Sequence, residues 1–142
     1  GPRELIDGVR AAKQFMTFVG GAPFQPAVAH ALTHEQDWIA SMRADLERKR
    51  TFLSHALSDA GLKVFDSAGT YFVCADLTPL GRTDAVAFCR ELPGRIGVAA
   101  VPVSVFVDDT ASWNHLVRFA FCKRDEVLTE AVARLNGLQE AR

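Results

Sequence analysis

The sequence has little of three features that mark specialised classes of protein: cysteine, net charge and long apolar runs. It contains three cysteines, an odd number with no CxxC pair, which excludes the disulfide framework of a small secreted protein. The formal net charge of -1 offers no field to attract nucleic acid or an anionic membrane. No run of about 18 apolar residues is present to span a bilayer. We therefore expect a cytoplasmic protein that binds neither nucleic acid nor membrane.

The composition is otherwise that of a folded globular chain. Apolar residues make up 49% and charged residues 23% of the 142 residues, enough for a sizeable core. This length allows one domain, or one domain with part of another, at about 100 to 200 residues per domain. The chain begins Gly1-Pro2 rather than with methionine. We expect it to be a processed or excised part of a longer protein.

The first third of the sequence is predicted to be helical. Apolar residues recur at helical spacing over residues 2–18, and a second short helix is expected over residues 27–32, after a loop rich in glycine and proline. Thr33 and Gln36 form the pattern of a capping box for a third helix over residues 34–60. At about 1.5 Å per residue that helix is roughly 40 Å long. A helix of this length typically bridges two bodies.

After Gly61 the apolar pattern changes to that of strands separated by turns. Four strands and two helices are expected in the remainder of the chain, with Pro93-Gly94 ending the first helix. The strands are predicted over residues 62–65, 70–76, 98–101 and 116–122, and the helices over residues 83–92 and 125–135. This order predicts an α+β fold, a small mixed or antiparallel sheet with helices on one face.

The last predicted strand carries the strongest indication of chemistry. Alternation places Val117 and Phe119 on a core face, whereas Arg118 lies on the opposite face among small apolar neighbours. A half-buried guanidinium needs an anion, because an unpaired charge is costly to bury. That anion is either a carboxylate or phosphate ligand or an internal acidic partner, and the pattern leaves both open. Tyr71, the one tyrosine, is either an aromatic wall of the same site or ordinary packing.

Other reactive residue types form no convincing site. His30 and His34 have the spacing of zinc ligands but are expected on different elements, so no metal site is predicted. Ser54-His55 is a neighbouring pair on a helix, where adjacent side chains do not face each other. The basic run Arg48-Lys49-Arg50 is expected to be a solvated helix face. We expect the three cysteines to fill the core.

Several motifs in colinear order resemble the C-terminal portion of class I pyridoxal-phosphate aminotransferases. Within that family the chain is most similar to the kynurenine and methionine aminotransferase-like branch, and in particular to N-succinyldiaminopimelate aminotransferases. The resemblance covers essentially the whole chain. It is carried by GPxxLIxxVRxxKQ at residues 1–14, PFQPAVA at residues 23–29, GTYF with AD at residues 69–76, VAAVPVSVF at residues 98–106 and LVRFAFCK at residues 116–123.

The resemblance implies roles for individual residues. Arg118 matches the arginine that binds the substrate α-carboxylate, and Tyr71 matches an aromatic position near the substrate side chain. Residues 102–106 match a segment that borders the pocket when the small domain closes. Phe18 and Val19 would reach the active site of the neighbouring subunit in a homodimer of the full enzyme.

The resemblance also implies a division of the chain and a cofactor. Residues 1–33 would be the tail of the large cofactor domain with its linker, and residues 34–142 the small C-terminal domain on its bridging helix. The full enzyme would use pyridoxal phosphate. None of the four lysines matches the lysine that forms the Schiff base, so no catalytic residue is assigned in this chain. We expect the chain alone to bind no cofactor and to be inactive.

The resemblance predicts the reaction of the full enzyme, which transfers an amino group between an amino acid and a 2-oxo acid. The implied donor is glutamate, and the implied acceptor is N-succinyl-2-amino-6-oxopimelate of lysine biosynthesis. The residues by themselves leave a second interpretation open. A free-standing α+β module would bind a small carboxylate through Arg118, or pair with another chain through residues 2–33.

Overall fold

The computed structural model describes residues 1–17 and 20–138, which form two compact units. The first unit is Gly1–Met42 and the second is Arg43–Arg142. The third helix, α3 (Gln36–Asp59), begins in the first unit and ends in the second. Among the described residues, no helix has both the length and the apolarity to cross a membrane.

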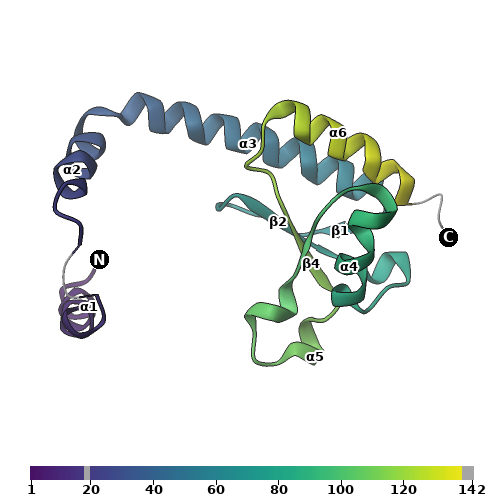
Figure 1. The fold of residues 1–142 in the computed structure, drawn as a ribbon, viewed down its shortest axis with the longest axis horizontal. Helices are drawn as coiled ribbons and strands as arrows, with labels where there is room; N and C mark the ends of the chain where they lie inside the picture. Colours follow the sequence, from purple (N-terminus) through teal and green to yellow (C-terminus); the bar gives the residue numbers. More distant parts are fainter. Residues whose placement is uncertain (18–19, 139–142) are drawn as a thin grey trace. The chain divides into compact units, whose positions relative to one another are not determined.

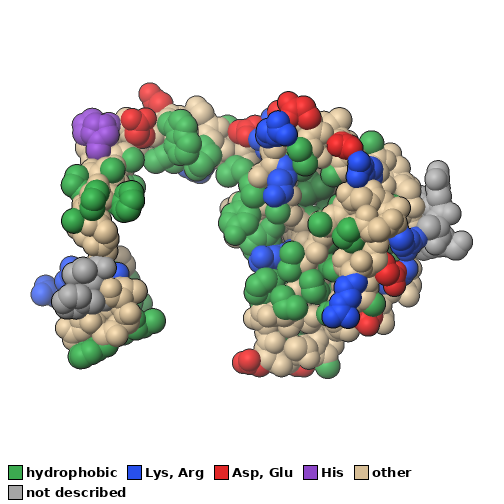
Figure 2. Space-filling view, viewed as in Figure 1, with side chains coloured by type: hydrophobic (Ala, Val, Ile, Leu, Met, Phe, Trp, Pro, Cys, Tyr) green, Lys and Arg blue, Asp and Glu red, His purple; other side chains and the backbone are tan. Residues whose placement is uncertain are grey.

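The first unit is built from helices that bury none of their own residues. Helix α1 spans Arg3–Met16, within the predicted range, and α2 spans Phe24–His34. The second helix thus starts earlier than the expected residue 27. Pro26 lies in its first turn, where a missing N–H removes no helical hydrogen bond. Hydrophobic side chains stand exposed on both helices, as Figure 2 shows; they include Leu5, Val9, Phe15, Phe24 and Leu32.

The predicted capping box at the start of α3 is wrong. The Thr33 hydroxyl donates to the carbonyl of Ala29 at 2.8 Å, inside α2, and the Gln36 side chain donates to the carbonyl of Leu32 at 2.6 Å. Both side chains therefore satisfy carbonyls at the end of α2 instead of N–H groups at the start of α3. At the other end of α3 the prediction is confirmed. Gly61 has φ 91°, and the N–H of Leu62 bonds the carbonyl of Leu57 at 3.0 Å.

A four-stranded antiparallel sheet forms the centre of the second unit (Figure 1). Its strands, in the spatial order β1-β2-β4-β3, are β1 (Lys63–Val64), β2 (Phe72–Asp76), β4 (Leu116–Ala120) and β3 (Val101–Pro102). The predicted α+β class is confirmed, and the sheet is antiparallel rather than mixed. The strand expected over residues 98–101 is wrong in extent, because pairing with β4 begins at Val101.

Two longer helices and several short turns complete the second unit. Helix α4 spans Ala85–Ile96 and α6 spans Asp125–Leu135. The short elements are η1 (Thr78–Leu80), η2 (Val103–Phe106), α5 (Thr110–Trp113) and η3 (Asn136–Leu138). The predicted end of α4 at Pro93 is wrong. The helix continues to Ile96 and is capped by Gly97, which has φ 70°, because Leu92 is buried and Ile96 packs against the core.

One hydrophobic core joins the three long helices of this unit to one face of the sheet. Helices α3, α4 and α6 contribute Leu57, Phe88 and Leu128, among others. The sheet contributes Val73 and Ala75 from β2 with Val117 and Phe119 from β4, which we call the covered face. The intervening residues Phe72, Cys74, Arg118 and Ala120 form the other side of the same two strands, which we call the open face.

Candidate functional site

Arg118 lies on an inner strand, in the middle of the open face. The register of β2 and β4 places Cys74 directly opposite Arg118, and the register of β3 and β4 places Val101 opposite it on the other side. Its two cross-strand neighbours are therefore uncharged. The guanidinium is presented by a strand whose next residue, Phe119, is fixed in the core.

The Arg118 guanidinium contacts aromatic rings instead of acidic side chains. Its central carbon lies 4.6 Å from the centre of the Phe72 ring and 4.2 Å from the centre of the Phe106 ring. Within the described part of the chain, no carboxylate lies within ion-pair distance of this guanidinium. Of the two interpretations that the sequence left open, an internal salt bridge is not what the structure shows.

Tyr71 lies just before β2 and is exposed. Its backbone carbonyl accepts a hydrogen bond from the N–H of Phe121 at 2.9 Å, which extends the pairing of β2 and β4 by one residue. Its ring packs edge-on against Phe72 at 5.6 Å. Among the described residues, the rings that contact the Arg118 guanidinium are those of Phe72 and Phe106. Tyr71 contacts Phe72 and is therefore one ring removed from the arginine.

Phe72 has no role predicted from the sequence, and Phe106 is placed only within a segment that borders the pocket, with no contact to Arg118 predicted for either ring. Phe72 is two residues before Cys74, so strand alternation alone puts it on the same face as Arg118 once the register is known. Phe106 ends η2, a turn held by Ser104, which is buried and donates to the amide oxygen of Asn114 at 3.4 Å. Val105 and Phe106 stay exposed. Local periodicity gives no signal for a contact made by such a turn.

Two titratable groups on β2, Cys74 opposite Arg118 and Asp76 at the end of the strand, have shifted pKa values. Burial raises the pKa of the Cys74 thiol, and the charge of Arg118 offsets part of that rise. Burial also raises the pKa of the Asp76 carboxyl, but hydrogen bonds from Thr78 and the positive fields of His115 and Lys63 outweigh it, so the pKa of Asp76 lies below its usual value. The Thr78 N–H donates to Asp76 at 2.8 Å. The open face therefore presents a neutral thiol and a cation.

Two other sequence expectations need correction. His30 and His34 lie on the same helix, α2, with their rings stacked at 4.3 Å, because that helix is longer than predicted. The described residues contain no group of three or more His, Cys, Asp or Glu side chains arranged to hold a metal ion. Two of the three cysteines expected in the core lie elsewhere, because Cys122 is exposed and Cys74 is half-buried on the open face. Cys89 packs against the core, and burial raises its pKa to about 11. Phe18 and Val19 lie outside the described residues.

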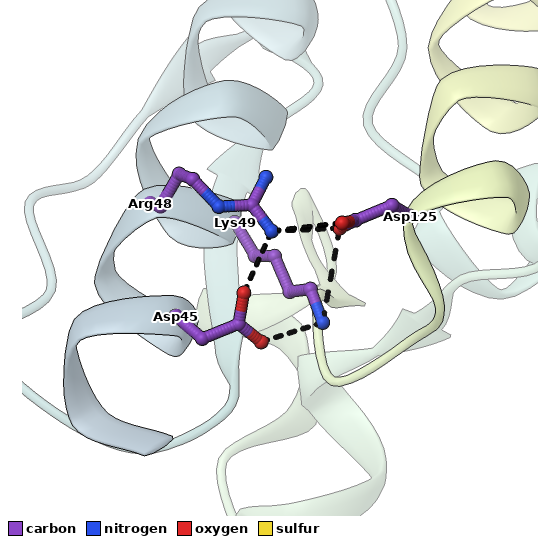
Figure 3. A network of polar contacts seen from close by, with 4 residues as sticks. All are labelled: Asp45, Arg48, Lys49 and Asp125. Carbon is purple, nitrogen blue, oxygen red and sulfur yellow. Dashed lines mark hydrogen bonds and ion pairs between the residues drawn. The ribbon is translucent and has the colours of Figure 1, made fainter. Parts of the chain in front are cut away.

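The basic run on α3 joins two helices of the second unit instead of being only a solvated face. Arg48 binds both carboxylate oxygens of Asp125, at 2.8 and 3.0 Å, at the start of α6 (Figure 3). Lys49, whose side chain is 14% exposed, binds Asp45 at 2.7 Å. Hydrogen bonds from Lys49 and Arg48 lower the pKa of the Asp45 carboxyl. These cations already have acidic partners and are not available for an external anion.

The lysines of the chain do not fit a Schiff-base site for pyridoxal phosphate. Lys13 donates to Thr17 on an exposed helix, and Lys49 belongs to the ion pairs just described. Lys63 lies over the ring of Phe65 at 5.6 Å, on the edge strand β1. Lys123 follows β4 and borders a cavity beside α6. The described residues thus provide an arginine without an acidic partner, whereas Lys13, Lys49 and Lys63 make contacts elsewhere.

Comparison with known proteins identifies the family to which this α+β fold belongs. The family model "Aminotransferase class I and II" matches residues 1–135, so the chain belongs to this family. Full-length members of this family are enzymes, transferases of amino groups that are generally dependent on pyridoxal phosphate.

Individual relatives agree with this family. The chain is 54% identical, over 99% of its length, to a Mycobacterium tuberculosis protein described as a probable N-succinyldiaminopimelate aminotransferase. It is 33% identical, over 96% of its length, to the methionine aminotransferase of Escherichia coli. The chain spans only 37% and 35% of these two proteins.

Solved structures share the fold. The structure of N-succinyldiaminopimelate aminotransferase from Mycobacterium tuberculosis matches 97% of the chain with a TM-score of 0.83 at 56% identity. That of Escherichia coli YbdL, identified as a methionine aminotransferase, matches 95% of the chain with a TM-score of 0.80 at 32% identity. The chain covers 36% and 35% of these two structures.

Proposed function

We propose that this chain is the substrate-binding C-terminal part of a pyridoxal-phosphate-dependent aminotransferase, and that Arg118 binds the α-carboxylate of its substrates. The observation that carries the proposal is the Arg118 guanidinium, half-buried on the open face with two aromatic contacts and no acidic partner among the described residues. Such a cation binds a carboxylate strongly, because its planar fork matches the two oxygens.

The chemistry that follows for this chain is binding and orientation. A carboxylate held by two parallel N–H donors has a fixed direction, so the rest of the amino acid is held in one orientation relative to the reacting groups. In this proposal, the lysine that forms the Schiff base belongs to a part of the full enzyme outside this chain. The chain alone then transfers no amino group.

The identity of the substrates is part of the same proposal. The names of the Mycobacterium tuberculosis relatives support N-succinyldiaminopimelate as a substrate, and with it N-succinyl-2-amino-6-oxopimelate as the acceptor. Glutamate as donor and a place in lysine biosynthesis follow from the resemblance to the family. Tyr71 would lie near the substrate side chain. The full enzyme would be a cytoplasmic homodimer in which Phe18 and Val19 reach the partner's site. Residues 1–33 would belong to the large domain and residues 34–142 to the small one.

Replacement of Arg118 in the full-length enzyme tests this function. Arg118→Ala should raise KM and lower kcat/KM for amino and 2-oxo acids by about 10² or more, because a charged and orienting contact is lost. Arg90, an exposed arginine on α4, provides a matched control, and Arg90→Ala should leave both constants unchanged. Unchanged kinetics in Arg118→Ala would remove Arg118 from the site.

A second experiment tests the dependence of this chain on the rest of the enzyme. The 142-residue chain is mixed with pyridoxal phosphate and reduced with borohydride, and any pyridoxyl adduct is mapped by mass spectrometry with and without amino acid. We expect no stoichiometric adduct at a single lysine, since none of the four lysines matches the one that forms the Schiff base. One modified lysine that an amino acid protects would show that the chain builds a cofactor site of its own.

A further inference from the structure

The two rings that contact Arg118 come from opposite sides of its strand. Phe72 is on β2, which pairs with one edge of β4, and Phe106 ends η2, which directly follows the strand on the other edge, β3. The guanidinium carbon lies within 4.6 Å of both ring centres. Contacts from both flanks limit the sideways movement of a long side chain that would otherwise sample many rotamers.

Phe106 contributes little to the core of this chain, and its ring faces the Arg118 guanidinium. Its side chain is 58% exposed, and η2 contributes Ser104 rather than Phe106 to the buried interior. A large exposed aromatic ring at a turn adds little to the core. A cation over the ring face is attracted by the negative potential of that face, so the ring stabilises Arg118 in one place.

This contact also leaves the arginine free to bind a ligand. A guanidinium has five N–H donors in its plane. An acidic partner would occupy some of these donors, whereas an aromatic ring over the central carbon leaves them free. Rings beside the guanidinium also exclude water, which strengthens its attraction to a carboxylate. The same residues therefore hold the cation without neutralising it.

We propose that Phe106, together with Phe72, is a positioning residue that holds the Arg118 guanidinium in the orientation required to bind a substrate carboxylate. This inference rests on the proposed function, because it assigns Phe106 a role that acts through Arg118. The aromatic face, and not merely the apolar bulk of the side chain, carries the effect.

Two substitutions in the full-length enzyme separate aromatic character from size. Phe106→Leu keeps an apolar side chain but removes the ring, whereas Phe106→Tyr keeps the ring. Propionate and propionamide serve as inhibitors of glutamate-dependent turnover, because they differ only in the charged group. Phe106→Leu should raise the inhibition constant of propionate about 5- to 10-fold and leave that of propionamide unchanged. Phe106→Tyr should stay within about 2-fold of the parent for both.

A double substitution shows whether the effect passes through the arginine. In an Arg118→Ala background, Phe106→Leu should cause no further change in the inhibition constant of propionate. The KM of glutamate should rise in Phe106→Leu more than kcat falls, because the substrate carboxylate is bound before the reaction. Thermal unfolding of each variant checks that the fold is retained.

The possible failures are distinguishable. If Arg118→Ala weakens propionate binding but Phe106→Leu does not, Phe106 has no positioning role and the proposed function stands. If Phe106→Leu weakens propionate and propionamide equally, the ring lines the pocket without acting on Arg118, and the inference is wrong. If Arg118→Ala itself leaves propionate binding unchanged, the proposed function fails.

Discussion

The two faces of strands β2 and β4 differ sharply although they are made from alternate residues of the same segments. On the covered face, Val73, Ala75, Val117 and Phe119 are all buried against helices. On the open face Ala120 is exposed, and Phe72, Cys74 and Arg118 are half-buried. The period of two in a strand thus places a packed interior and a charged surface one residue apart.

This difference shows that the two faces depend on different properties of their side chains. The covered face depends on apolar volume, because close packing leaves little room for change. The open face depends on the charge of Arg118 and the rings beside it, since it contributes little to the core. A substitution on one face should therefore affect stability, and a substitution on the other should affect binding.

The largest effect on stability is expected from the covered face. Phe119→Ala should lower the free energy of unfolding of the chain by about 3 to 5 kcal/mol, through lost apolar burial and the cavity left behind. Urea denaturation followed by circular dichroism measures this loss. Ala120→Ser, on the open face next in sequence, is the control and should change stability by less than about 0.5 kcal/mol. A loss below about 1 kcal/mol in Phe119→Ala would contradict the distinction.

Asp76 sharpens the comparison, because it lies on the same side of β2 as Phe72 and Cys74 and is nevertheless buried. Asp76→Ala should lower the free energy of unfolding by about 1 to 3 kcal/mol, since the N–H of Thr78 loses a charged acceptor. Asp76→Asn keeps an oxygen at this place and should cost less. Equal losses in the two variants would show that the hydrogen bond is not what stabilises this end of β2.

The acid dependence of stability gives a second measurement at Asp76. Its pKa is lowered in the folded chain, so its contribution is fully present above the unfolded value of about 3.9 and is lost as the pH falls through the lower folded value. Asp76→Asn should remove this part of the decrease in stability below about pH 4. An unchanged acid limb of the stability curve in this variant would count against the lowered pKa.

The smallest effect is expected at the ion pairs that link α3 to α6, away from both faces. Lys49→Met preserves the side-chain stem but removes the charge near Asp45 and Asp125. We expect a decrease in Tm of about 1 to 4 °C that becomes smaller at high salt. Arg43→Met, at an exposed position on the same helix, is the control. A decrease that is independent of salt would point to packing of the stem instead.

The fold was largely predictable from the sequence where local pattern and tertiary structure agree. Alternation in residues 116–122 correctly placed Val117 and Phe119 in the core, and Gly61 correctly ended α3. The errors arose where tertiary contacts overrode local signals. Pro93 did not end α4, because Leu92 just before it is buried and Ile96 beyond it packs against the core.

The candidate site was predictable only in part. Arg118 could be singled out as a cation on a face of small residues, whereas the rings around it depend on a register between strands distant in sequence. The partner of Arg48 is similarly non-local, since Asp125 lies 77 residues away. Pairings of this kind are set by the whole fold, and periodicity within one segment does not encode them.

The alternation along β4 also constrains how this sequence can change through evolution or engineering. Position 120, which is exposed on the open face, can be varied while positions 117 and 119 keep the interior intact. An insertion or deletion of one residue within the strand has the opposite character, because it would exchange the two faces and turn Arg118 toward the helices. Point substitutions on the open face therefore leave the interior in place, whereas changes of length in this strand do not.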